Sequence, residues 1–210
     1  MVEQNKNLNV DSNIDVIDSK ENSSKIFIVF KTIIRALLDL LRTLLVSFLI
    51  AWFITTFIIA NSVVPTGSME STIMTGTRVV GDRLCYKFWD EPERGDIIIF
   101  HSPDDYSIYF VKRLIGLPGD VVEIKKDSSD SNFGGVYING ERLNEPYLKE
   151  PMEVWEEMRF EVPSEGYFFM GDNRNYSNDA RFWDTHYIKR DKLVAKVLFQ
   201  YWKGFKWLDN

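Results

Sequence analysis

The sequence has one cysteine and two histidines in 210 residues, and these scarcities exclude several kinds of chemistry. A single cysteine cannot form an intrachain disulfide, a C-x-x-C redox pair or a thiolate zinc site. His101 and His186 are too few for a three-ligand metal centre. The sequence therefore predicts no metal and no cofactor, and we expect Cys85, between apolar neighbours, to be a small buried hydrophobe.

The chain also lacks a basic surface and the commonest catalytic signatures. Its 31 acidic and 25 basic residues give a net charge of −6, which argues against nucleic acid as the main partner. The patterns G-x-S-x-G, H-E-x-x-H, S-x-x-K and the phosphate-binding P-loop do not occur. His186 lies close to Asp184 in the sequence, and such a pair could orient a catalytic base.

Long apolar runs are confined to the N-terminal third of the chain. Residues 1–25 are rich in Asn, Asp and Ser, which predicts a disordered tail. Residues 26–64 are predicted to be an interfacial helix followed by a transmembrane helix. Charges on one face mark the interfacial part, and the run from Leu44 to Val64 has the length needed to cross a bilayer.

Basic residues at the N-terminal flank of this run indicate its orientation. By the positive-inside rule they place the tail in the cytoplasm and residues 65–210 outside it. A signal peptide cleaved after Ser62 is the alternative, although the leader is long for one. The flanking basic residues are Lys20, Lys25, Lys31, Arg35 and Arg42.

Residues 65–210 read as an antiparallel, mainly β domain. Short apolar runs alternate with turn signals, for example in residues 77–100, 107–124 and 192–202. Asn139-Gly140 between two apolar runs predicts a tight hairpin. The polar segment 125–133 is expected to be a hairpin tip, and a helical period is present only around residues 152–158.

Lys112 is the candidate residue that the β pattern itself brings out. On an alternating strand it shares a face with Phe110 and Leu114, so the ammonium is directed toward a dry environment. Burial lowers a lysine pKa, and a lysine that is neutral near physiological pH can act as a general base. Alternatively, the side chain snorkels into water from an edge strand.

Three stretches taken together resemble the bacterial type I signal peptidases, which are membrane-anchored Ser/Lys endopeptidases. They are PTGSM at 65–69, VKRLIGLPGD at 111–120 and GDNRNYSNDAR at 171–181, after an N-terminal anchor. The resemblance covers the chain from about Ile26 to its end. It implies a signal-peptidase β fold and removal of N-terminal signal peptides after small residues at P1 and P3.

The resemblance also implies a role for each residue that matches the family's pattern. Ser68 would be the nucleophile, Lys112 the general base, and Ser177 the residue that orients the lysine. Thr66 and the Ser68 backbone N–H would form the oxyanion hole. Asp179 and Arg181 would support the site, and shallow substrate pockets would be lined by Val64, Pro65, Phe110 and Val111.

The expected partners are signal-peptide-bearing preproteins and the lipid bilayer. The expected location is the bacterial inner membrane, crossed once. Four positions depart from the family's pattern: Ser71 stands where proline is common, Asn175 and Tyr176 where an acidic and a small polar residue are frequent, and Ala180 where serine is common. Two other functions stay open, a self-cleaving repressor-type protease with the same dyad and an anchored β domain that only binds a partner.

Overall fold

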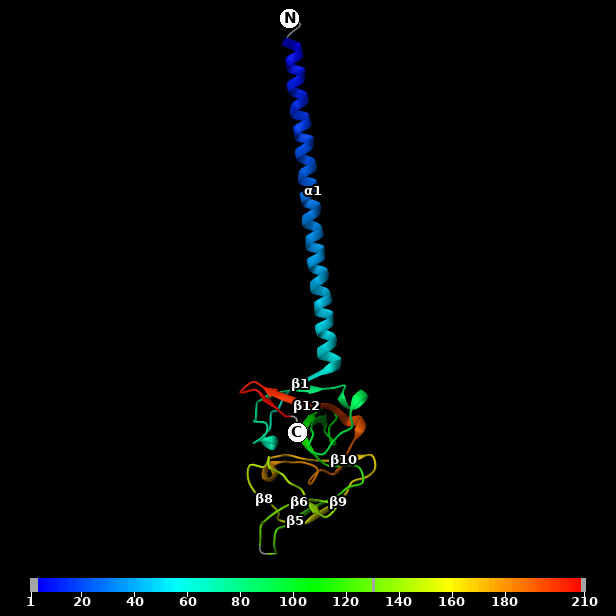
Figure 1. The fold of residues 1–210 in the computed structure, drawn as a ribbon, viewed down its shortest axis with the longest axis vertical. Helices are drawn as coiled ribbons and strands as arrows, with labels where there is room; N and C mark the ends of the chain where they lie inside the picture. Colours follow the sequence, from blue (N-terminus) through cyan, green and yellow to red (C-terminus); the bar gives the residue numbers. More distant parts are fainter. Residues whose placement is uncertain (1–3, 130, 209–210) are drawn as a thin grey trace. The chain divides into compact units, whose positions relative to one another are not determined.

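The computed structural model describes residues 4–129 and 131–208 of the chain (Figure 1). These residues form two compact units, residues 1–52 and residues 53–210, which are described separately. The first unit is a helix. The second unit contains all the strands.

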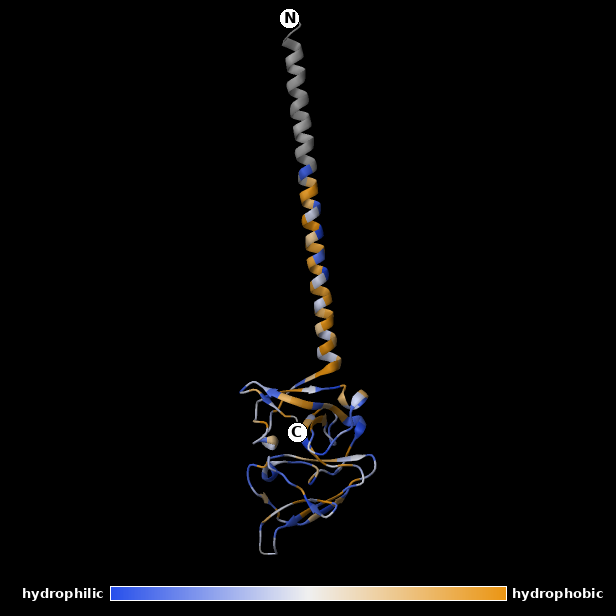
Figure 2. Ribbon diagram, viewed as in Figure 1, coloured by the Kyte–Doolittle hydropathy of each residue, from blue (hydrophilic) through white to orange (hydrophobic). Residues whose placement is uncertain are grey.

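The first unit consists of helix α1, Gln4–Phe53, which continues into the π-helical turn η1, Ile54–Ile58. From Phe27 to Ile58 this helix is long and apolar enough to cross a membrane (Figure 2). The helix also runs through most of the segment that the sequence predicts to be a disordered tail. Adding a residue to an existing helix costs far less than starting one, so a polar flank can continue a stable apolar helix.

The helical run ends six residues earlier than the apolar composition predicts. Residues 59–63 do not form the last turn of a membrane helix but strand β1, Ile59–Val63, which pairs with β2, Arg78–Asp82. Pairing with β2 explains the change, and Pro65 adds to it by biasing Val64, the residue that precedes it, toward extended backbone. The β domain thus includes residues before position 65, and its extracytoplasmic location stays a prediction.

The larger of two antiparallel sheets has the strand order β1-β2-β12-β3-β4-β10-β11, with β13 paired to β12 (Figure 1). Its apolar strands confirm the predicted mainly β fold. The remaining strands are β3, Ile97–His101; β4, Tyr109–Gly116; β10, Gly166–Met170; β11, Ile188–Lys189; β12, Leu193–Tyr201; and β13, Lys206–Trp207.

The second sheet has the order β7-β6-β5-β9, with β8 paired to β6. Its strands are β5, Val121–Lys126; β6, Phe133–Ile138; β7, Glu141–Arg142; β8, Met152–Glu153; and β9, Met158–Glu161. One apolar core is shared between the sheets, because Ile98 and Leu114 of the first belong to the same buried cluster as Val122 and Val136 of the second. The two sheets are therefore parts of a single domain.

Turn chemistry in the β domain agrees with the sequence at one hairpin and differs at two segments. Asn139 and Gly140 have positive φ angles of 54° and 89° and join β6 to β7, which confirms the predicted hairpin. The helix that the apolar period indicates at residues 152–158 is a wrong prediction, since strand β8 begins at Met152. The run after Asp82 turns into a π-helical segment, η3 (Cys85–Trp89), because the Asp82 carboxylate accepts a hydrogen bond from the Leu84 N–H at 2.7 Å.

Candidate active site

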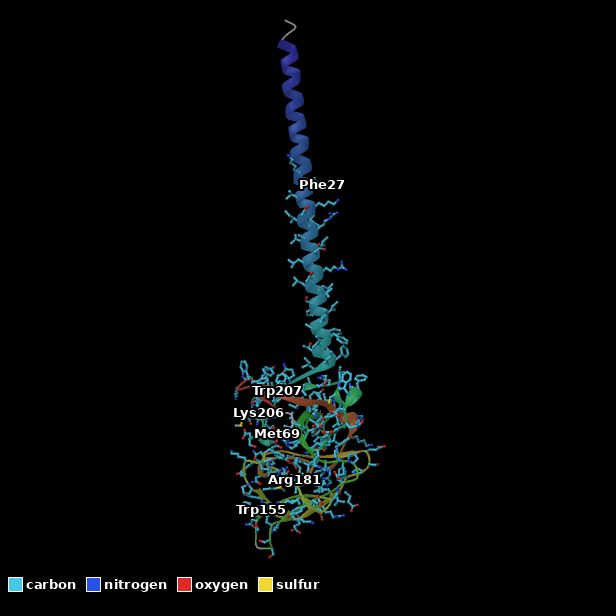
Figure 3. All side chains as sticks on the ribbon, viewed as in Figure 1. Phe27, Met69, Trp155, Arg181, Lys206 and Trp207 are labelled. Atoms are coloured by element: carbon cyan, nitrogen blue, oxygen red, sulfur yellow. The ribbon has the colours of Figure 1, made fainter. Side chains whose placement is uncertain are left out.

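Ser68 lies in a 3₁₀ turn, η2 (Gly67–Met69), between strands β1 and β2. A segment more than a hundred residues away in the sequence holds this turn. The Asn173 backbone N–H donates to the Ser68 carbonyl at 3.0 Å, and the Asn173 side-chain amide donates to the Gly67 carbonyl at 2.9 Å. Met69, which follows Ser68 and is labelled in Figure 3, is fully buried and anchors the turn in the core.

Lys112 lies on β4, opposite Ile98 of β3, and only 4% of it is exposed. Its ammonium lies 5.9 Å from the centre of the Phe110 ring, as expected for two residues on one face of a strand. Its Nζ donates a hydrogen bond to the Ser177 hydroxyl at 3.1 Å. The lysine is therefore buried, and the prediction of a dry environment is confirmed over the alternative of snorkelling.

Burial lowers the pKa of Lys112 from its ordinary 10.5 to about 8. Desolvation is the main cause, because taking the ammonium out of water disfavours the charged form. Asp179 and Asp172 act in the opposite direction, and Arg181 adds to the lowering. A substantial fraction of the Lys112 side chain is consequently neutral just above physiological pH.

The next residue, Arg113, points to the opposite face of β4 and forms a buried pair with Asp172. Its Nε and Nη2 donate to the two carboxylate oxygens of Asp172 at 2.8 Å and 2.7 Å. The same carboxylate accepts the Thr72 hydroxyl at 2.5 Å, four residues after Ser68. Arg113 thus connects the strand that carries Lys112 to the turn that carries Ser68.

Asp179 and Arg181 form a second buried pair, directly behind Lys112 and Ser177. The Arg181 Nε donates to Asp179 at 2.7 Å, and the other Asp179 oxygen accepts the Gly171 N–H at 2.9 Å. Arg181, labelled in Figure 3, also donates to the Arg174 carbonyl at 2.7 Å. The pair fixes both ends of the loop that presents Ser177.

Ser68 and Lys112 line a common cavity of about 410 Å³. The residues predicted for substrate pockets are all in its wall, namely Val64, Pro65, Phe110 and Val111. Thr66 is there too, with its hydroxyl 3.5 Å from the Ser68 hydroxyl. A larger and more open cleft of about 680 Å³ runs along residues 142–152 and includes neither Ser68 nor Lys112.

Sequence reasoning missed two residues that shape this site, Gly171 and Asn173. A Cβ at Gly171 would lie 2.2 Å from the Ser177 hydroxyl and 2.4 Å from the Ser68 carbonyl, so only glycine fits there. Both residues belong to the predicted loop 171–181, but no local pattern reveals contacts to a turn so distant in sequence. The Nδ1 atom of His186 lies 2.6 Å from the Ala180 carbonyl oxygen, and a pairing of this ring with Asp184 stays a prediction.

Comparison with known proteins identifies the family. The model of the signal peptidase family, peptidase S26, matches residues 37–202. The chain belongs to this family. It is 34% identical over 170 residues to a probable signal peptidase I-2 of Synechocystis sp., covering 79% of this chain and 73% of the relative. It is 32% identical over 195 residues to signal peptidase IB of Staphylococcus aureus, covering 84% and 95%.

A signal peptidase I of Enterococcus faecalis V583 is a similar solved structure, with 31% identity and a TM-score of 0.42 over 51% of this chain and 97% of that one. Membership of the S26 family makes the protein a serine endopeptidase that removes signal peptides. The apolar helix from Phe27 to Ile58 fits a membrane-anchored enzyme of this kind.

Proposed function

We propose that the enzyme uses Ser68 as nucleophile and Lys112 as general base, and that it cleaves after small residues at P1 and P3. One observation carries the proposal. A buried lysine with a pKa lowered to about 8 shares a cavity of about 410 Å³ with a serine held in a tight turn. Serine needs an adjacent base to become a useful nucleophile, and a desolvated lysine can replace histidine in that role.

In the first half of the reaction, neutral Lys112 takes the proton of the Ser68 hydroxyl as its oxygen attacks the scissile carbonyl. The Ser177 hydroxyl, 3.1 Å from Nζ, orients the amine. The resulting ammonium then donates its proton to the leaving amine when the peptide bond breaks. The product is an ester between Ser68 and the carboxyl end of the signal peptide.

In the second half, Lys112 takes a proton from a water molecule, which attacks the ester. The bond between the ester carbon and the Ser68 oxygen then breaks, Lys112 returns the proton to that oxygen, and the signal peptide leaves. The buried Asp179 and Asp172 attract the ammonium that forms in each half and so moderate the cost of charging it in a dry site. A lysine with this pKa can therefore both accept and return the proton near neutral pH.

The developing oxyanion needs donors that are already in place when the carbonyl oxygen becomes charged. We assign this role to the Ser68 backbone N–H and the Thr66 hydroxyl, whose oxygen is 3.5 Å from that of Ser68. The contacts of Asn173 to the Gly67 and Ser68 carbonyls hold the turn that presents the backbone donor.

The preference for small substrate residues is assigned to the apolar wall of the cavity. Val64 and Val111 are buried, Phe110 is half-buried and Pro65 is exposed. Branched and aromatic side chains in the wall leave room for small groups such as an alanine methyl. A larger side chain would have to displace packed residues, which costs free energy.

We further propose that the protein crosses the bacterial inner membrane once, with its N-terminus in the cytoplasm. Lys25, Lys31, Arg35 and Arg42 precede Leu44, where the uncharged part of the helix begins, as the positive-inside rule requires for that orientation. Preproteins are held at the same membrane by their own apolar segments. Shared anchoring raises their effective concentration at the site without tight binding at the scissile bond.

The test is cleavage of a preprotein with an Ala-x-Ala site by full-length enzyme in detergent or lipid. Ser68→Ala and Lys112→Met are expected to lower kcat by ~10³-fold or more, because the members of a nucleophile–base pair act as a unit. Lys112→Met keeps the apolar stem and removes only the base. Cleavage by either variant at the wild-type rate would disprove the dyad.

Matched controls separate this loss from general damage. Ser164→Ala and Lys125→Met change the same residue types on exposed or partly exposed positions outside the cavity, and wild-type rates are expected for both. Replacing the P1 alanine of the substrate by leucine tests the size preference. Equal cleavage of both substrates would contradict the assignment of the wall.

A further inference from the structure

Residues 144–153, here called the strap, run from just after β7 to the end of β8 in the five-stranded sheet and contact the loops of the catalytic site. Neither residue of the Ser/Lys dyad belongs to the strap. Its contacts nevertheless reach the turn after Ser68, the strand that carries Lys112 and the loop before Ser177.

The first connection is to the turn that follows the nucleophile. Ser71 has a positive φ of 83°, and its hydroxyl donates to the Tyr147 carbonyl of the strap at 2.9 Å. A left-handed backbone at a non-glycine residue costs roughly 1–3 kcal/mol and persists only where the surroundings determine it. The strap therefore supports a turn whose backbone is strained.

The second connection is to the buried pair beside Lys112. The Tyr147 ring lies 3.9 Å from the Arg113 guanidinium and covers it. Arg113 in turn holds Asp172, which accepts the Thr72 hydroxyl. Desolvation, together with the charge of Glu145, raises the pKa of the Tyr147 phenol, so this group stays neutral at the pH values of an assay.

The third connection is to the loop that presents Ser177. Glu145 accepts two hydrogen bonds from the Arg174 guanidinium, and the side chains are only 6% and 1% exposed. The Tyr147 hydroxyl donates to the same carboxylate at 2.7 Å. Arg174 Nε donates to the Gly171 carbonyl at 3.0 Å, which places this buried pair directly against the glycine that separates Ser68 from Ser177.

The far end of the strap holds the same loop a second time. The Glu153 N–H donates to the Asn175 side-chain oxygen at 2.9 Å, and the Asn175 amide donates to Glu150 and to the Pro151 carbonyl at 3.2 Å each. Asn175 precedes Ser177 by two residues. Two of the three residues of the 3₁₀ turn η4, Arg174–Tyr176, are thus attached to the strap, namely Arg174 and Asn175.

We propose that the strap is a positioning element of the catalytic centre, in which Glu145 and Tyr147 hold the Ser68 turn and the Ser177 loop in place around Lys112. The proposal rests on the proposed Ser/Lys dyad. It gives the five-stranded sheet a function in catalysis, because that sheet is the support from which the strap reaches the site. Glu145 and Tyr147 are positioning residues, since they act through Arg174, Arg113 and Ser71.

The test compares Tyr147→Ala with Tyr147→Phe in the full-length enzyme. The alanine variant uncovers Arg113, and displacement of catalytic groups by about 1 Å can cost ~10²-fold, so we expect kcat to fall by ~10–100-fold with KM within about threefold. The phenylalanine variant keeps the ring over Arg113 and is expected to regain most of kcat. Tyr137→Ala is the matched control, because Lys125 lies over the Tyr137 ring at 5.3 Å in the same sheet.

The pH profile distinguishes positioning from mere stabilisation. The charges of Asp179, Arg181 and Asp172 act on Lys112, which also donates to the Ser177 hydroxyl, and its burial depends on the loops that the strap holds. Loosened loops admit water and so raise the pKa of Lys112. The rise of kcat/KM with pH should therefore have its midpoint at a higher pH in Tyr147→Ala than in the wild type. A variant that only reduces the folded fraction would lower the rate equally at every pH.

If Tyr147→Ala does not fold, Ser71→Ala tests the same claim, since it removes only the hydroxyl that binds the strap. A several-fold lower kcat with a midpoint at higher pH supports the proposal. An unchanged kcat and midpoint in the folded variants, or the same change in Tyr137→Ala, would overturn it. Failure of the dyad is seen separately, as wild-type activity in Ser68→Ala.

Discussion

The two faces of strand β4 carry adjacent buried cations in opposite circumstances. Lys112 and Arg113 are each 4% exposed. On one face, Arg113 has two hydrogen bonds to the Asp172 carboxylate at 2.7–2.8 Å. On the other, Lys112 donates to the neutral Ser177 hydroxyl at 3.1 Å, and burial lowers its pKa to about 8.

The comparison shows how partner and residue type decide whether a buried cation is structural or reactive. Arginine keeps its charge in proteins and suits a planar, bidentate pair, whereas lysine loses its proton readily when it is dehydrated. Alternation along the strand places the two roles 180° apart, so one face is held rigidly while the other supplies a base. Replacing the lysine by a permanently charged residue should therefore destroy activity, and removing the carboxylate partner of the arginine should lower stability.

The largest expected effect comes from making position 112 resemble position 113. In Lys112→Arg the side chain stays protonated at all assay pH values and cannot accept the serine proton. We expect kcat to fall by ~10³-fold or more, with no recovery up to pH 10. Rates of preprotein cleavage across this pH range measure it. Activity within tenfold of wild type would mean that Lys112 is not the base.

The next effect comes from removing the partner of Arg113. Asp172→Asn leaves a buried guanidinium without its countercharge, which is expected to cost about 3–5 kcal/mol of the free energy of unfolding. Denaturant unfolding of the variant gives this value. The control is Asp127→Asn, which breaks an exposed pair with Arg142 and should cost less than about 1 kcal/mol. Equal losses would contradict the importance of burial.

A smaller effect is expected where the two loops of the site meet. In Gly171→Ala the new methyl would lie 2.2 Å from the Ser177 hydroxyl, so either Ser177 or the Ser68 turn must shift. A displacement of this kind should lower kcat by ~10²-fold while the domain stays folded. Gly135→Ala is the control, because the added carbon there would meet only the flexible end of the Arg142 side chain, at 3.1 Å. Similar kcat values for both variants would argue against the close fit.

The smallest of these effects concerns the hydroxyl that orients Lys112. In Ser177→Ala we expect a loss of ~10-fold in kcat, about the contribution of one hydrogen bond. The Ser177 oxygen accepts a hydrogen bond from the Lys112 ammonium and so favours the charged form. Removal of this oxygen should therefore lower the Lys112 pKa, and the rise of the rate with pH should occur at lower pH. Kinetics from pH 6 to 10 check both changes. A rise displaced to higher pH would contradict the expected direction of the pKa change.

Local patterns in the sequence were enough to predict the strands and the face of Lys112. Period-two alternation needs only neighbouring residues, and it gives both the β domain and the burial of Lys112 beside Phe110. The end of the membrane helix was misjudged, because residues 59–63 are apolar enough for a helix. Their pairing with β2, which composition does not reveal, makes them a strand.

The way the catalytic groups are held together could not be predicted in the same manner. The resemblance indicates which residues act, but the contacts of Asn173 to Gly67 and of Ser71 to Tyr147 join segments 106 and 76 residues apart. Such contacts follow from the packing of two sheets and not from any local period. The left-handed backbone of Ser71 likewise follows from that packing, since serine has little preference for it.

The central claim is that Lys112 must lose its proton before it can act. The pH dependence of kcat/KM for the full-length enzyme tests this claim most directly. This ratio reports the ionisation of the free enzyme. Below its pKa of about 8 the amine is charged and inactive, so the rate should rise with pH along one limb that is half complete near pH 8. A profile that is flat between pH 5 and 10, or a limb centred near the ordinary lysine value of ~10.4, would contradict the role of a buried, neutral Lys112.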